Sequence, residues 1–241
     1  MPDSSPQLSI VVPMHNEAGG AGALVREISE TCAAIDHEIV AVDDASTDAT
    51  LAELTAAKAD LPQLRVLSHQ ANAGQSRAVR SGVIAARAPV VATLDGDGQN
   101  PPGEIPKLYA ALMADDALGL VGGERQKRQD TRAKLLASRV GNGVRKRLLH
   151  DDADDTGCGL KVFRRDVFLA LPYFDHIHRY LPALVSREGW GTAFLPVSHR
   201  AREHGSSKYT NLGRLKVSLA DLRGVRWLNS RMRQPGEVRE V

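Results

Sequence analysis

Short apolar runs that alternate with helical patterns constrain the fold of this chain more than any other feature. The apolar runs fall at residues 8–12, 38–42, 64–67 and 90–94, and helical patterns lie between them at about 18–34, 51–57 and 74–86. This alternation is typical of βαβ units around a mostly parallel sheet. An apolar share of 42% in 241 residues is enough to bury the core of such a sheet. The sequence therefore predicts an α/β fold.

Polar loops follow three of these predicted strands, at residues 13–17, 43–48 and 95–102. In open α/β sheets, ligands bind beyond the carboxyl ends of the strands, so the three loops are expected to share one site. Their carboxylates would repel one another without a counter-charge, which implies a ligand or a cation. Glu17 and Asp44 are candidates to accept hydrogen bonds from a nucleobase or a ribose, whereas Asp48 suits the start of a helix equally well.

The third loop carries two carboxylates and a carboxamide spaced two residues apart. If the backbone stays extended, Asp95, Asp97 and Gln99 point the same way and converge on one point. Three oxygen donors suit Mg²⁺ or Mn²⁺, which normally fills such a site together with phosphate oxygens of the substrate. Gly96 and Gly98 would let a ligand approach the backbone closely. The alternative is a polar turn, because Asp, Gly and Asn are common turn residues.

A further polar segment, residues 72–77, leads into the third predicted helix. The N-terminus of a helix attracts anions, because its free N–H groups and its dipole both favour negative charge. A simple turn and cap, permitted by Gly74, explains the same residues equally well. The segment therefore predicts a helix start, with either an anion or a turn in front of it.

Charge and composition narrow the classes of partner. The net charge is only +2, but residues 124–147 carry nine Lys/Arg against two acids, and residues 199–241 carry ten against four. Such basic regions suit a diphosphate or an anionic membrane face. Nucleic acid is a weak candidate, because 4% aromatic residues offer no stacking platform. Cys32 and Cys158 cannot build a disulfide framework, and no signal peptide or long apolar run is present, so a cytoplasmic location is expected.

The end of the chain has the pattern of a basic amphipathic helix. Arg214, Lys216, Arg223 and Arg226 fall between apolar residues that recur every three or four positions: Leu212, Leu215, Leu219, Leu222, Val225 and Trp227. Such a helix can lie among lipid headgroups, with its Trp at the interface and its cations on anionic lipid. Packing against its own domain or another subunit is an equal alternative. We expect a catalytic domain over residues 1–210, followed by this helix and tail over 211–241.

The motifs taken together resemble those of the family 2 glycosyltransferases, in particular the polyprenyl-phosphate branch that includes dolichol-phosphate mannose synthases. The resemblance runs from the first strand to about Tyr209. It is carried by P-x-x-N-E at 13–17, D-D-x-S-x-D at 43–48, N-x-G-x-x-x-A-x-x-x-G at 72–82, D-x-D-x-Q-x-P-P at 95–102, G-x-R at 123–125 and R-x-R-x-x-G-x-S-K at 200–208. The order and spacing of these motifs are far more specific than any one of them.

The resemblance implies a GT-A fold, a Mg²⁺ or Mn²⁺ cofactor and a set of site residues. The metal contacts would be Asp97 and Gln99, with Asp95 toward the ribose. The nucleotide would be lined by Pro13, His15, Glu17, Val42, Asp44, Asp95 and Gly96. Phosphate-binding groups would be Arg125, Lys134, Ser138, Arg139, Arg202 and Lys208. Asp95, Asp97, Arg125 and Arg202 would be the catalytic residues.

The implied reaction moves a hexose, with inversion, from a donor such as GDP-mannose or UDP-glucose to a polyprenyl phosphate at the cytosolic face of the membrane. Donor and acceptor are both anions, so cations must hold them together and stabilise the leaving charge. A phosphate acceptor is already deprotonated and needs no strong base. Asp155 would be the base for a hydroxyl acceptor, or would instead orient Arg125 or Arg139. A UDP-linked amino sugar or aminoarabinose derivative is also a possible donor.

Some residues depart from the dolichol-enzyme pattern. His15 replaces a Tyr and Ala45 replaces a Gly, which predicts the loss of a positive-φ position at residue 45, while residues 158–161 resemble bacterial undecaprenyl-type relatives.

Two other functions stay open. A nucleotidyltransferase would need a G-x-G-rich loop that residues 13–20 lack, and a catalytically weak scaffold that binds a separate membrane protein is disfavoured by the intact acidic loop.

Overall fold

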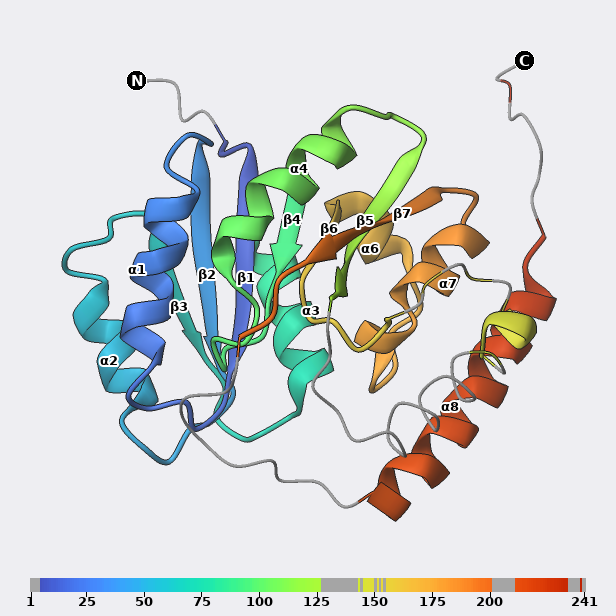
Figure 1. The fold of residues 1–241 in the computed structure, drawn as a ribbon. Coiled ribbons are helices and arrows are strands. Elements are labelled where there is room, and N and C mark those ends of the chain that lie inside the picture. Colours follow the sequence, from blue (N-terminus) through green and yellow to red (C-terminus); the bar gives the residue numbers. More distant parts are fainter. Residues whose placement is uncertain are drawn as a thin grey trace.

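Seven strands form one sheet within the residues that the computed structural model describes, which are 5–126, 143, 145–149, 151, 153, 155–200, 211–233 and 239. The strands are β1 (Leu8–Met14), β2 (His37–Asp43), β3 (Leu64–Ser68), β4 (Val90–Thr93), β5 (Leu118–Arg125), β6 (Lys161–Arg164) and β7 (Gly191–Val197). Their order across the sheet is β3-β2-β1-β4-β6-β5-β7, and all neighbours are parallel except at β6, which runs antiparallel to β4 and β5 (Figure 1). The predicted α/β fold with a mostly parallel sheet is confirmed.

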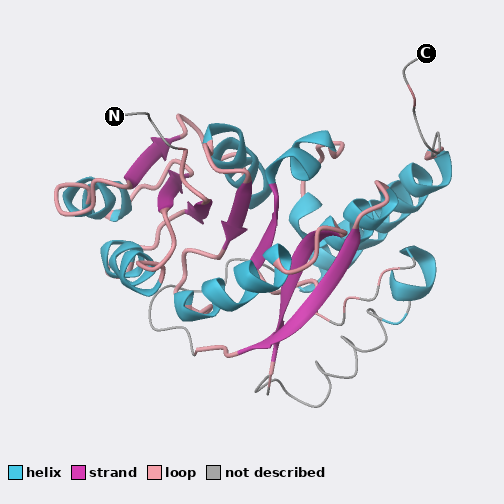
Figure 2. Ribbon diagram, turned by 90° about the horizontal axis from the view of Figure 1, so that it is seen from above, coloured by secondary structure: helices cyan, strands magenta, loops and turns pink. Residues whose placement is uncertain are grey.

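Helices cover both faces of this sheet (Figure 2). They are α1 (Ala21–Thr31), α2 (Thr50–Ala57), α3 (Gln75–Ala85), α4 (Ile105–Met113), α6 (Arg165–Ala170), α7 (Leu181–Arg187) and α8 (Asn211–Arg231), with 3₁₀ turns η1 (Pro102–Glu104) and η2 (Ile177–Arg179). Alternate residues of a strand point to opposite faces, so Ile10 and Val12 pack toward α1, α2 and α4, while Val11 packs toward α3. The core is therefore two apolar layers separated by the sheet.

The bounds of α2 and α3 match the prediction within one residue, whereas the start of α1 shows what the sequence pattern missed. Helix α1 starts at Ala21, three residues later than predicted, because the N–H groups of Ala18 and Gly19 donate to the carboxylates of Asp48 and Glu53. Those side chains hold the segment after β1 as a loop. The neighbouring α3 lies close to β1, since a Cβ at Gly82 would overlap Val11. This close packing positions the N-terminus of α3 at the carboxyl edge of the sheet.

Glu104 in η1 connects the start of α4 to the segment after β7. Its carboxylate accepts hydrogen bonds from the backbone N–H and Oγ of Ser198, at 3.0 and 2.7 Å, and pairs with Lys107 at 2.6 Å. Burial opposes the charge, but the hydrogen bonds from Lys107 and Ser198 lower the pKa of Glu104 to about 2. The ionised carboxylate is therefore stabilised by folding.

This linkage predicts a defined pH dependence of stability. Because the folded pKa lies below the ordinary value of 4.5, Glu104 stabilises the fold fully above about pH 4.5, and the contribution is lost as the pH falls through about 2. Thermal unfolding of the natural chain and of Glu104→Gln should therefore differ at neutral pH and converge in acid. A difference in melting temperature that stays constant from neutral pH down to about pH 2 would contradict this assignment.

Between residues 218 and 231, where its side chains are described, helix α8 packs on its own domain through one side. Val225 is buried, Leu222 and Leu228 pack against the same apolar cluster, and the hydroxyl of Tyr180 donates to the Ser218 carbonyl at 3.2 Å. The predicted single apolar stripe is wrong for its described members, which divide between two sides, while the side chains of Leu212 and Leu215 lie outside the description. Leu219 and Trp227 remain 49% and 58% exposed. No helix in the described part of the chain is both long enough and apolar enough to span a membrane.

Candidate donor and phosphate site

Two loops at the carboxyl edge of the sheet, after β1 and β2, bind to each other. The Nδ1–H of His15 donates to the Asp44 carbonyl at 2.9 Å, and the backbone N–H of Asn16 donates to Ser46 Oγ at 3.0 Å. In return, the N–H of Thr47 donates to the side-chain carbonyl of Asn16 at 2.8 Å. The loops after β1 and β2 are therefore one rigid unit, with His15 Nε2 outside these contacts.

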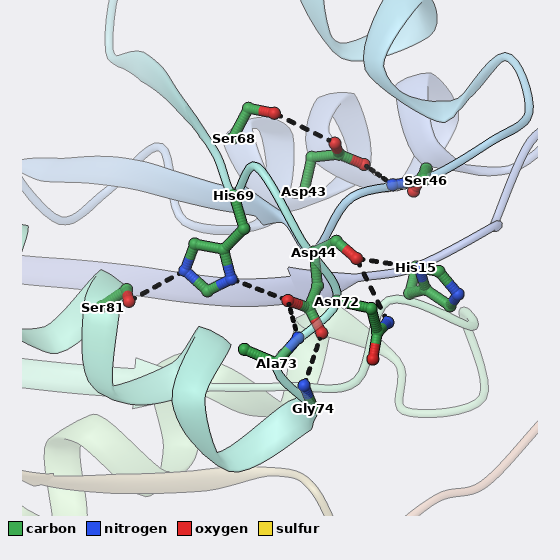
Figure 3. Close-up of polar contacts among 10 residues, drawn as sticks. All are labelled: His15, Asp43, Asp44, Ser46, Ser68, His69, Asn72, Ala73, Gly74 and Ser81. Atoms are coloured by element: carbon green, nitrogen blue, oxygen red, sulfur yellow. Dashed lines mark hydrogen bonds and ion pairs between the residues drawn. The ribbon is translucent and has the colours of Figure 1, made fainter.

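Asp44 joins this unit to the start of α3 (Figure 3). Its carboxylate is 3% exposed and accepts hydrogen bonds from the backbone N–H groups of Ala73 and Gly74, at 2.9 and 2.8 Å, and from His69 Nδ1 at 2.7 Å. His69 in turn contacts Ser81 Oγ at 2.9 Å through its other nitrogen. An anion does meet the N-terminus of α3, as one reading of the sequence predicted, but it is supplied by the protein.

Ala45, next to this carboxylate, adopts the positive φ that the sequence predicted it would lose. Its φ is 56°, a left-handed conformation that disfavours a Cβ. The hydrogen bonds of Asp44 and Ser46 on either side hold the turn in this shape. Relief of the strain is expected to outweigh the extra freedom that glycine gives the unfolded chain.

Replacing Ala45 by Gly should therefore stabilise the protein by about 1 kcal/mol, measured by denaturant unfolding. Ala52→Gly is the matched control, because Ala52 is exposed and lies inside α2, where the backbone is helical and glycine gains nothing. The control should be neutral or destabilising. Equal effects of the two substitutions would show that the turn at Ala45 is unstrained.

The acidic loop after β4 is a turn, not the extended segment that the sequence predicted. The turn begins at Gly96, where a Cβ would lie 2.8 Å from the Pro13 carbonyl oxygen, and Gly98 has a φ of 71°. The close approach that Gly96 permits is thus to β1 instead of to a ligand. Because of the turn, Asp95 and Asp97 line two different hollows.

Asp97 lies in an open groove between the loop after β1, the start of α1 and the acidic loop. Its lining residues are Glu17, Gly19, Gly20, Ala23, Leu24, Glu27, Gly96, Asp97, Gly98 and Arg200. Arg200 donates from its backbone to the Gln99 carbonyl at 2.8 Å, and its guanidinium pairs with Glu27 at 2.7 Å. The groove therefore presents carboxylates, from Glu17, Glu27 and Asp97, together with the guanidinium of Arg200. A site for a metal-bound diphosphate requires groups of these two kinds.

Asp95 lies over a smaller cavity on the other side of the turn. The lining residues are Pro13, Gln75, Val79, Thr93, Leu94, Asp95, Gly159, Lys161, His178 and Leu181. The side-chain amide of Gln75 donates to Asp95 Oδ1 at 2.6 Å. A Cβ at Gly159 would overlap the Asp95 carboxylate, so this contact requires glycine. Burial lowers the pKa of His178 well below its ordinary value, which leaves the imidazole neutral at pH 7.

Arg125 at the end of β5 forms a two-point ion pair with Asp155. The Nε–Oδ2 and Nη2–Oδ1 distances are 2.6 and 2.8 Å, and the two side chains are 17% and 12% exposed. Burial opposes the charge of Arg125, but its hydrogen bonds and charge interaction with Asp155 raise its pKa above the ordinary value. Asp155 therefore orients Arg125, which was one of the two roles predicted for it.

The other predicted site residues lie in the core, in the two hollows or outside the described part of the chain. Val42 is fully buried between β1 and α3, so its side chain belongs to the core, and the prediction that it lines the nucleotide is wrong for that side chain. Glu17 lines the groove and Pro13 lines the smaller cavity, and their contact with a nucleotide stays a prediction. Five predicted phosphate-binding or catalytic residues lie outside the described residues: Lys134, Ser138, Arg139, Arg202 and Lys208.

The donor set fits a divalent cation that is bound mostly through substrate. No group of three His, Cys, Asp or Glu side chains that could hold a metal occurs among the described residues. Mg²⁺ is usually held by one or two carboxylates together with phosphates and water, and this loop offers Asp97, Asp95 and the Gln99 amide. The chemistry of these oxygen donors fits the ion, while the turn keeps them from forming a complete cage by themselves.

Three residues of the site were not predicted as site residues. Gln75 and Lys161 lie in the sequence segments 72–82 and 158–161, but only the structure shows that they line the cavity beside Asp95. His178 carried no sequence signal, because it reaches the cavity through η2, and its hydrogen-bond partner Ser76 lies 102 residues earlier in the chain. Such long-range proximity is a property of the folded sheet alone.

Comparison with known proteins identifies the family. The model for glycosyl transferase family 2 matches residues 9–171, more than half of the chain. The chain belongs to glycosyl transferase family 2. The predicted membership is thus confirmed, and the matched region contains the acidic loop, Arg125 and Asp155.

Two curated proteins show which members of the family this family 2 glycosyltransferase is similar to. It is 34% identical to the dodecaprenyl-phosphate galacturonate synthase of Rhizobium johnstonii, over 98% of this chain and 71% of that protein. It is 36% identical to the undecaprenyl-phosphate 4-deoxy-4-formamido-L-arabinose transferase of Edwardsiella ictaluri, over 84% of this chain and 62% of that protein. The chain thus spans about three fifths of the length of such arabinose transferases.

Solved structures confirm the GT-A fold of the family 2 glycosyltransferase. The glucosyl-3-phosphoglycerate synthase of Mycobacterium tuberculosis, in complex with phosphoglyceric acid, superposes with a TM-score of 0.70 at 19% identity, over 96% of this chain and 82% of that one. The same enzyme in complex with Mn²⁺, UDP-glucose and phosphoglyceric acid gives a TM-score of 0.69. At 19% identity, this similarity shows the fold alone.

Proposed function

We propose that this chain transfers a hexose from a nucleotide diphosphate donor to a polyprenyl phosphate, with inversion. The observation that carries the proposal is that, at the carboxyl edge of the sheet, Asp97 lines an open groove and Asp95 lines the neighbouring cavity, while the charge of Asp95 also acts on Arg125 of the Arg125–Asp155 pair. Curated relatives that act on dodecaprenyl and undecaprenyl phosphate support the lipid acceptor. GDP-mannose and UDP-glucose are the donors we propose to test first.

The loops after β1 and β2 would hold the nucleoside. His15 and Asn16 are fixed by hydrogen bonds to Asp44 and Ser46, so this wall of the site is preorganised. Preorganisation reduces the entropy lost when a donor binds. Glu17, on the rim of the groove, and His15 Nε2 provide polar groups for the base and ribose.

Arg125 would stabilise the charge that develops on the leaving diphosphate. A guanidinium held by two hydrogen bonds needs no reorganisation during the reaction, which is the basis of electrostatic catalysis. The acceptor phosphate is ionised near neutral pH and can attack the anomeric carbon directly, so no general base is required. Asp155 is engaged by Arg125, which argues against a role as the base for a hydroxyl acceptor.

Asp97, Gln99 and Asp95 are the residues that would hold Mg²⁺ or Mn²⁺. When bound, the cation would supply Lewis-acid stabilisation to the diphosphate oxygens. Asp97 Oδ1 accepts the N–H of Gln99 at 3.2 Å, which orients this carboxylate within the groove. The loop is thereby held in place before the ligand arrives.

The test is calorimetric titration with GDP, UDP, GDP-mannose and UDP-glucose, each with and without Mn²⁺. Metal-dependent binding of one nucleotide series, followed by transfer of its sugar to undecaprenyl phosphate, would support the proposal and identify the base. Metal-dependent binding without transfer to lipid would favour a scaffold or a hydroxyl acceptor. A folded sample that binds none of the four would overturn the transferase assignment.

We further propose that the outward side of α8 associates with the cytosolic face of a membrane. It carries exposed Leu219 and Trp227 together with exposed Arg223, Arg226 and Arg231, while Asp221, the acid of this helix, contacts His176 at 3.0 Å instead. Arginines near anionic headgroups and a Trp at the interface favour such an orientation. In Figure 1, α8 starts on the side of the molecule where β1 and β2 end.

Trp227 gives a direct readout of this association. Its fluorescence should shift to the blue with vesicles that contain phosphatidylglycerol, and Trp227→Phe should remove the shift, leaving Trp190 as a control. Arg223→Glu with Arg226→Glu should weaken vesicle binding, and so should about 0.5 M salt. No binding to either anionic or neutral vesicles would favour a separate membrane protein as the anchor.

A further inference from the structure

A buried lysine lies beneath the acidic loop and is not explained by the fold alone. Lys161 starts β6, is only 4% exposed and donates a hydrogen bond to the carbonyl of Cys158. This carbonyl is its one hydrogen-bond acceptor among the described residues. An ammonium group has three N–H donors, and a buried charge is costly unless it is well partnered.

The carboxylates nearby do not form an ion pair with this ammonium. Asp155 binds Arg125 at two points, and Asp95 accepts the amide of Gln75. Both carboxylates influence Lys161 through their charge, but no carboxylate in the described part of the chain lies within ion-pair distance of its Nζ. Two of its N–H groups are thus left for a partner that the described residues do not supply.

Lys161 borders the cavity that lies on the far side of the turn from Asp97. The other polar groups of this cavity are an amide, a hydroxyl, a neutral imidazole and a carboxylate, from Gln75, Thr93, His178 and Asp95. Groups of this kind are suited to hydroxyl-bearing ligands, whereas the groove at Asp97 carries the groups suited to a diphosphate. A donor that spans the turn would place its nucleotide at the groove and its sugar at this cavity.

We propose that Lys161 is a donor-contacting residue, whose ammonium donates from the wall of this cavity to an oxygen of the sugar that is transferred. This inference rests on the proposed function and deepens it, because it assigns the groove to the nucleotide and the cavity to the sugar. Its consequence is that Lys161 contributes to the affinity for the nucleotide sugar but not to that for the nucleotide alone.

The proposal also predicts that stability and binding change in opposite directions. Replacing a buried, poorly partnered charge by an apolar side chain of similar length is often neutral or stabilising. Lys161→Met should therefore have an equal or higher melting temperature than the natural chain. A lysine kept only for structure would instead show a lower melting temperature with unchanged binding per folded molecule.

The experiment compares two affinities in three proteins. Calorimetry with Mn²⁺ measures UDP against UDP-glucose, and GDP against GDP-mannose, for the natural chain, Lys161→Met and the control Lys58→Met, whose side chain is exposed at the end of α2. In Lys161→Met, the affinity for the nucleotide sugar should fall by about tenfold or more, with that for the bare nucleotide changed by less than about threefold. Lys58→Met should bind both like the natural chain.

Each other outcome overturns the assignment. An equal fall for nucleotide and nucleotide sugar would place Lys161 in the organisation of the nucleotide pocket, and unchanged affinities would remove it from the site. If Lys161→Met does not fold, Lys161→Gln is subjected to the same comparison. A natural chain that binds no nucleotide at all overturns the proposed function and this inference together, whereas normal binding with an unchanged ratio removes only the role of Lys161.

Discussion

Asp97→Asn should abolish sugar transfer while leaving the fold intact. The substitution removes the negative charge from the groove but keeps the side-chain oxygen that accepts the Gln99 N–H. A metal-dependent reaction that loses a carboxylate ligand is expected to slow by on the order of 10³-fold or more. The measurement is single-turnover transfer to undecaprenyl phosphate, with calorimetry to follow the Mn²⁺-dependent part of nucleotide binding.

Asp60→Asn is the matched control for this experiment, because Asp60 is 73% exposed and makes only a long contact of 3.6 Å with Arg26. It should retain the rate and the metal dependence of the natural chain. Thermal unfolding should be similar for all three proteins, since Asp97 lies on a half-buried loop. Full activity in Asp97→Asn would remove this residue from the metal site.

Asp155→Ala is expected to be the most destabilising single change in the site. It leaves the Arg125 guanidinium, 17% exposed, without its two-point partner. Breaking a buried pair in this way costs about 3–5 kcal/mol, because the remaining charge stays buried. The free energy of unfolding, measured in denaturant, should fall by that amount, and transfer should fall as well because Arg125 loses its orientation.

An exposed ion pair gives the control for Asp155→Ala. Asp116 pairs with Arg164 at 3.1 Å but is 99% exposed, so Asp116→Ala should change stability by less than about 1 kcal/mol. The double variant Arg125→Met with Asp155→Leu should recover much of the stability without recovering transfer. Recovery of both would show that the pair is structural and takes no part in the reaction.

The first half of the fold could be predicted because its signals are local. β1 to β4 and the helices between them follow continuous apolar runs and helical spacing, and the predicted strands match within one or two residues. Because the loops that follow parallel strands lie at the same edge of the sheet, Glu17, Asp44 and Asp95 are then expected at one end of it. Local pattern and overall topology agree there, which is what makes such a prediction reliable.

The second half of the site could not be predicted, because it depends on which strand lies beside which. The antiparallel β6 has four residues, and nothing in its sequence says that it inserts between β4 and β5. This insertion brings Gly159 and Lys161 to Asp95. The separation of Asp95 from Asp97 was missed for another reason: a D-x-D pattern fits an extended strand and a turn equally well, and contacts of Gly96 with β1 favour the turn.

β6 also determines when the site can be assembled during synthesis. The strands β3, β2, β1 and β4 pair with one another, and β5 pairs with β7, but the two groups are joined only through β6 among the described strands. A nascent chain that ends before residue 161 therefore exposes the unpaired edge of β4, which is apolar and open to pairing with other chains. Ribosome-bound chains of this length are therefore expected to aggregate more readily than the folded protein, and the cavity that Gly159 and Lys161 line cannot form until β6 has emerged.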